Sequence, residues 1–155
     1  MEIKIENLTK AYGDFKAVDN MNLNIADGEL VGLLGPSGCG KSTTLFMLAG
    51  LNDPTSGHIY FGGKDVTKVA PEDREIGLVF QNYALYPHMT VADNIMFPLI
   101  NRKVPKAEAR ERAQEMAKVV QLDHLMDRKP KALSGGQQQR VAIARALVKK
   151  PEVLL

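Results

Sequence analysis

The sequence is poor in cysteine, in long apolar runs and in charge of one sign. A single cysteine among 155 residues cannot form an internal disulfide, which favours a reducing compartment. No apolar run approaches the roughly 20 residues of a membrane-spanning helix, and the first residues lack the apolar core of a signal peptide. Because 20 lysines and arginines nearly balance 18 aspartates and glutamates, no general surface for nucleic acid is expected. These absences predict a cytosolic chain that binds no nucleic acid.

The rest of the composition is that of an ordinary globular domain. The pattern of apolar residues in the first part of the chain predicts strands. Apolar residues make up 45% and charged residues 25% of the chain, a normal balance for one domain of this length. Ile3 and Ile5 alternate with charged residues, and residues 20–25 alternate asparagine with apolar side chains, which is the period of a half-buried strand. The continuous apolar run 30–34 predicts a strand buried on both faces. Residues 58–61 and 76–80 predict two more strands, and residues 42–49 predict a helix.

The second part of the chain reads as helices. Thr90 and Asp93 have the spacing of a capping box, and Pro98 is expected to bend or end the short helix that follows. Another helix is expected to begin near Pro105. Its apolar face would consist of Ala109, Ala113, Met116, Ala117 and Val120.

A last helix is predicted after Ser134, which has Gln137 at the capping-box spacing. Lys149 and Lys150 suit the negative end of that helix, and Pro151 would stop it. Strands in the first part and helices in the second predict α/β layers with a helical insertion at about residues 82–150.

A glycine-rich loop carries the strongest signal for binding. Residues 35–42 match G-x-x-x-x-G-K-[ST] at every fixed position, between an apolar run and a helical segment. Glycines let backbone N–H groups converge on an anion, and the following helix directs its positive end at phosphates. Lys41 adds a full charge, and the hydroxyl of Ser42 suits Mg²⁺. The residues expected to hold the phosphates are Gly35, Pro36, Ser37, Gly38, Cys39, Gly40, Lys41, Ser42 and Thr43.

A phosphate loop alone is compatible with kinases, GTPases and motor ATPases. A second motif narrows the class of nucleotide-binding protein. Residues 133–137 read Leu-Ser-Gly-Gly-Gln, and a serine and two glycines at a helix start form another anion site. The two motifs, in this order, resemble the nucleotide-binding domain of ATP-binding-cassette (ABC) transporters. The resemblance extends over the whole chain.

The resemblance implies an α/β fold, the P-loop ABC-type ATPase domain, with an N-terminal antiparallel β subdomain and an inserted α-helical subdomain. Residues 1–155 would be the N-terminal portion of that domain. Residues 1–81 would form the nucleotide-binding core and β subdomain, residues 82–150 the helical subdomain with the signature motif, and residues 151–155 the start of the Walker B strand. The Walker B Asp and Glu are absent from these residues, so the 155-residue chain by itself is expected to bind ATP but to hydrolyse it negligibly.

The resemblance also implies roles for individual residues. Tyr12 would stack on adenine with Val18 nearby, and Gln81 would reach Mg²⁺ and the attacking water, with Ser42 as the other metal ligand. The cofactors would be ATP and Mg²⁺. In a head-to-tail homodimer, the signature motif would close over the nucleotide held by the second ATPase domain. The residues expected there are Ser134, Gly135, Gly136, Gln137 and Gln138.

Residues 81–94 and 127–136 look like those of importers for maltose and other oligosaccharides. By this resemblance, Tyr83, Tyr86 and Phe97 would lie where a membrane-spanning permease subunit docks, at the cytoplasmic face of the membrane. Importers for polyamine, iron, sulfate or glycerol phosphate share much of this sequence and remain alternatives. A non-catalytic nucleotide-binding fragment or interaction module is another alternative. A soluble ABC ATPase of DNA repair or translation is disfavoured by the segment 83–90.

Overall fold

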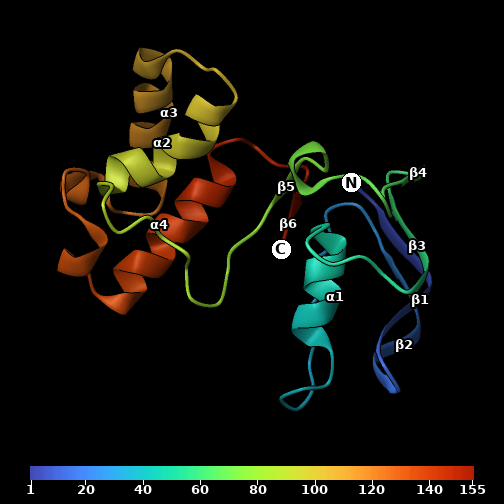
Figure 1. Cartoon of the computed structure of the whole chain (residues 1–155). Coiled ribbons are helices and arrows are strands. Elements are labelled where there is room, and N and C mark those ends of the chain that lie inside the picture. The colour runs from blue at the N-terminus through green and yellow to red at the C-terminus, as the bar shows by residue number, and fades with distance from the viewer. The chain divides into compact units, whose positions relative to one another are not determined.

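The computed structural model describes all 155 residues, which form two compact units (Figure 1). The first unit comprises residues 1–76 with Leu155, and the second comprises residues 77–154. None of the helices combines the length and the apolar character that crossing a bilayer requires.

The first unit contains an antiparallel sheet (Figure 1). Its strands are β1 (Ile3–Tyr12), β2 (Phe15–Ile25), β3 (Ser56–Phe61) and β4 (Lys64–Asp65), in the order β2-β1-β3-β4. The alternation predicted for the first strands is confirmed, because the isoleucines of β1 are buried while its charged residues face solvent.

Register and helix packing produce the core of this unit. Ile5 of β1 lies opposite Leu23 of β2 and Ile59 of β3, and Ile5 and Ile59 are fully buried. Helix α1 (Lys41–Leu48) contributes Met47 to the buried residues. The helix predicted over 42–49 is therefore confirmed to within one residue.

Two predicted strands are wrong in whole or in part. Residues 30–34 form no strand, and Leu30 and Leu34 are 99% and 95% exposed. A strand buried on both faces needs hydrogen-bonding neighbours, and no strand of residues 1–155 pairs with this run. Of residues 76–80 only β5 (Ile76–Gly77) is a strand, paired with β6 (Val153–Leu154).

The second unit contains three helices (Figure 1), which pack around one apolar core. They are α2 (Val91–Asn101), α3 (Lys106–Val119) and α4 (Gly135–Leu147). Both predicted capping boxes are present, at the starts of α2 and α4. Short 3₁₀ turns occur at Asp123–Leu125 and Pro130–Ala132 here, and at Pro71–Asp73 in the first unit. The predicted face of α3 is confirmed, because Ala109, Ala113 and Ala117 are fully buried against the other helices.

Pro98 does not end its helix, because α2 continues through it to Asn101. An internal proline costs roughly 3 kcal/mol. Burial of Ile95, Met96 and Leu99 contributes about 1.5–3 kcal/mol for each side chain. Packing thus outweighs the lost backbone hydrogen bond.

Candidate functional site

The phosphate loop ends on a glycine that no other residue can replace without strain. Gly40 precedes α1 with a φ of 89°, and a Cβ built on it would lie 2.2 Å from the carbonyl oxygen of Ala17. The same Cβ would be 3.2 Å from a methyl group of Val18, which is itself buried. Strand β2 therefore holds the end of the loop close against its backbone.

The loop is folded around the ammonium group of Lys41. Lys41 Nζ donates to the carbonyl oxygens of Gly35 at 2.8 Å and Pro36 at 2.7 Å, and it lies 3.4 Å from Cys39 Sγ. Three residues of the loop thus contact one positive charge. Cys39 is exposed, as a residue at an accessible binding loop should be.

Unpaired backbone donors lie at the start of α1. The helix has no side-chain cap, and the first backbone N–H that is bonded is that of Thr44, which donates to the Gly40 carbonyl at 2.8 Å. The N–H groups of Lys41, Ser42 and Thr43 are therefore free, and the hydroxyl of Ser42 is exposed. Free N–H groups, the helix dipole and an ammonium group together favour an anion with several oxygens.

The opposite end of α1 is anchored by Arg74, which sequence reasoning missed. Arg74 is 5% exposed, and its Nη1 donates to the carbonyls of Met47 at 2.8 Å and Leu48 at 3.0 Å. Its other nitrogens donate to Val69 and Thr67. A cation at these carbonyls stabilises the negative helix end, and burial lowers the pKa of Arg74.

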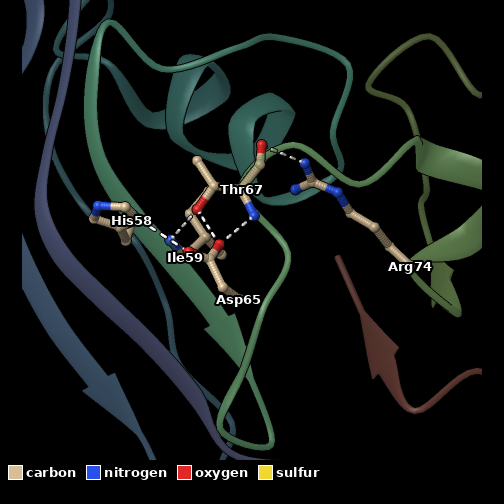
Figure 2. A network of polar contacts seen from close by, with 5 residues as sticks. All are labelled: His58, Ile59, Asp65, Thr67 and Arg74. Atoms are coloured by element: carbon tan, nitrogen blue, oxygen red, sulfur yellow. Dashed lines mark hydrogen bonds and ion pairs between the residues drawn. The ribbon is translucent and has the colours of Figure 1, made fainter.

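A network of hydrogen bonds links Arg74 to the sheet (Figure 2). Thr67, whose carbonyl accepts from Arg74, donates its hydroxyl to Asp65 Oδ1 at 2.6 Å and accepts from the N–H of Ile59 at 2.9 Å. Asp65 also lies 3.0 Å from His58 Nδ1. The hydrogen bonds from Thr67, followed by the contact with His58, lower the pKa of Asp65. The end of the phosphate-loop helix is in this way tied to β3 and β4.

Tyr12, the candidate adenine platform, lies at the end of β1 and is 51% exposed. Its hydroxyl accepts from Asn52 Nδ2 at 2.8 Å, and Lys10 Nζ lies 5.1 Å from the ring centroid. Lys10 also donates to the carbonyl of Asp53 at 2.6 Å. These contacts fix the ring and leave much of it accessible.

The signature motif forms the first turn of α4. Gln137 N donates to Ser134 Oγ at 3.3 Å, and Ser134 N donates to Gln137 Oε1 at 2.9 Å. A Cβ built on Gly135 or Gly136 would meet nothing within 4 Å. Gln138 folds back, with Nε2 donating to two loop carbonyls rather than pointing away from the chain.

The remaining candidates lie in the second unit. Gln81 is exposed in a turn after β5, so Ser42 and Gln81 belong to different units. The ring centroids of Tyr86 and Phe97 are 4.5 Å apart. Tyr83 has a φ of 63°, which is rare for a residue with a side chain.

Comparison with known proteins gives the family of the chain. Residues 18–155 match the family model described as ABC transporter. The chain is 56% identical to the oligosaccharides import ATP-binding protein MsmX of Bacillus subtilis, over 99% of this chain and 42% of that protein. It is 55% identical to the Fe(3+) ions import ATP-binding protein FbpC of Brucella abortus, over 99% of this chain and 43% of that protein.

A solved structure is similar over nearly the whole chain. It is the dimeric, post-hydrolysis ATP-binding cassette MJ0796 bound to ADP and Pi, with a TM-score of 0.88 and 40% identity. The alignment covers 98% of this chain and 72% of that one. The chain therefore belongs to the ABC transporter family, and the predicted fold class is confirmed. It spans less than half the length of MsmX and of FbpC.

Proposed function

We propose that this protein is the ATP-binding, energy-coupling subunit of an ABC importer, and that in its full-length form it hydrolyses ATP as a head-to-tail dimer. The observation that carries the proposal is the phosphate loop. One ammonium group and three free N–H groups of a helix start lie beside a glycine that admits no side chain. This arrangement suits a polyphosphate.

The residues fit magnesium-bound ATP. Lys41 and the N–H groups at the start of α1 would bind phosphate oxygens, and the exposed hydroxyl of Ser42 would be a metal ligand. Mg²⁺ would neutralise charge that develops on the phosphates during hydrolysis. Tyr12 would stack on the adenine with the ring face that Lys10 does not cover. Gln81 is proposed to position the water and to contribute to the metal site.

The signature motif supports a head-to-tail homodimer. Glycine in a helix costs about 1 kcal/mol relative to alanine, and no contact within the chain requires Gly135 or Gly136. A nucleotide bound to a second copy would explain the open backbone there. MJ0796, the solved relative, is itself dimeric.

A membrane partner and a solute complete the proposal. We infer that Tyr83, Tyr86 and Phe97 lie where permease subunits dock, which would place the protein at the cytoplasmic face of the membrane. A sugar or oligosaccharide is the proposed solute, in line with the name of MsmX. The name of FbpC keeps iron as an alternative. Uptake of labelled oligosaccharide and of Fe³⁺ in cells with and without the protein would separate the two.

The binding test compares Lys41→Ala with Lys64→Ala by calorimetry of magnesium-bound ATP. A charge pair at 4 Å is worth about 4 kcal/mol at an effective dielectric constant of 20, so Lys41→Ala should weaken binding about a thousandfold. Lys64 is exposed on β4, and its removal should leave affinity unchanged. Equal ATP affinity in the two variants would contradict the proposal. Binding without phosphate release by the full-length protein would instead favour a non-catalytic module.

A further inference from the structure

The segment that follows Gln81 has a strained backbone. Tyr83 and Ala84 adopt φ values of 63° and 46°, so two consecutive residues with side chains lie in the left-handed region. Such conformations persist only where the surroundings impose them, and they cluster at functional segments. The contacts that impose this one can be identified.

Arg145 of helix α4 holds both strained residues. Its Nη1 donates to the Ala84 carbonyl at 2.7 Å, and its Nη2 donates to the Tyr83 carbonyl at 2.8 Å. Its guanidinium carbon lies 5.4 Å from the ring centroid of Tyr86. The planar fork of an arginine can make these three contacts at once, and the point charge of a lysine cannot.

Helix α2 holds the other end of the segment. Asn94 is fully buried, and its Oδ1 accepts from the N–H of Tyr86 at 2.9 Å while its Nδ2 donates to the Tyr86 carbonyl at 3.1 Å. The Tyr86 backbone is thus fixed by one side chain. Residues 83–86 are thus held by side chains from two helices. Asn94 belongs to α2, and Arg145 belongs to α4, whose cap is Ser134.

We propose that Arg145 is a positioning residue that couples residues 83–86 to α4, the helix that begins with the signature motif. Helix α4 is a continuous rod from its cap at Ser134 to Leu147, so displacement of residues 83–86 would move the signature motif through Arg145. This inference rests on the proposed function, because the proposed function places residues 83–86 where a permease subunit docks. ATP binding at Lys41 requires no contribution from Arg145.

The test uses Arg145→Lys in the full chain, with Arg140→Lys as the matched control. Arg140 lies on the same helix and donates to a single backbone carbonyl, that of Val120, at 3.1 Å. Amide hydrogen exchange reports the segment directly, because the N–H groups of Tyr83 and Tyr86 are both bonded. We expect both amides to exchange about tenfold faster in Arg145→Lys and to be unchanged in Arg140→Lys.

The functional arm measures hydrolysis by the full-length protein in its complex with the permease subunits. Arg145→Lys should lower permease-stimulated phosphate release about tenfold, with ATP affinity within about twofold of the wild type. Unchanged exchange at Tyr83 and Tyr86, or stimulation equal to that of Arg140→Lys, would overturn the inference. Absence of stimulated hydrolysis in the wild type would contradict the proposed function instead, and the exchange rates would still decide whether Arg145 positions the segment.

Discussion

Arg74→Met is the most informative single change for the stability of the first unit. Methionine fills a similar volume but cannot donate a hydrogen bond. The substitution would leave the buried carbonyls of Leu48 and Thr67 without a donor, whereas the carbonyl of Met47 keeps the N–H of Gly50 at 3.1 Å.

The magnitude follows from the two buried acceptors that lose their donor. Each unsatisfied buried carbonyl costs about 1–3 kcal/mol, so the lower limit is about 2 kcal/mol for the pair. For a protein of this size, that corresponds to a melting temperature lower by about 4–8 °C. Arg74→Lys keeps the charge at the end of α1 but loses the fork, so it should fall between Arg74→Met and the wild type.

Urea unfolding followed by circular dichroism measures the effect, with Arg112→Met as the control. Arg112 is exposed and pairs only with Glu108 one helical turn away, a contact worth about 0.3–0.5 kcal/mol. If Arg74→Met lies within about 1 kcal/mol of Arg112→Met, the idea that Arg74 anchors the phosphate-loop helix is wrong.

Two further predictions concern the first unit. Tyr12→Ala should weaken ATP by about 1–3 kcal/mol if the ring stacks on adenine, whereas Tyr12→Phe should bind normally. Calorimetry with inorganic triphosphate is the control, and an equal loss for that ligand would exclude stacking. The pKa of Asp65 is lowered from its ordinary value of 3.8 by Thr67 and His58, so the native state binds fewer protons there than the unfolded state. The stabilisation is present above pH 3.8 and is lost as pH falls through the lower folded pKa. Asp65→Asn should therefore flatten the decline of the free energy of unfolding in acid. If urea melts below about pH 4 show the same dependence of that free energy on pH in the variant and the wild type, this prediction is wrong.

Local features were predictable from the sequence because their determinants lie within a few residues of one another. The capping box of Ser134 and Gln137 needs only a spacing of three residues and a helix to follow. The phosphate loop likewise places its glycines, Lys41 and the helix start in one continuous segment. The amphipathic face of α3 follows from a 3.6-residue period that does not depend on which partner covers it.

Features that depend on distant partners were not predictable. Residues 30–34 have the composition of a buried strand, but a strand forms only where another strand supplies hydrogen bonds. Pro98 remains helical because the buried side chains around it outweigh its local cost.

The two arginines illustrate the same limit most clearly. Arg74 meets carbonyls 26 and 27 residues away, and Arg145 meets carbonyls 61 and 62 residues away. Nothing near either residue in the sequence marks it, since a backbone carbonyl is present at every position and only folding selects which ones an arginine reaches. The sequence by itself determined the family and the local form of both motifs. Tertiary structure alone decided which side chains hold those motifs in place, because that depends on contacts between segments that the chain brings together only when it folds.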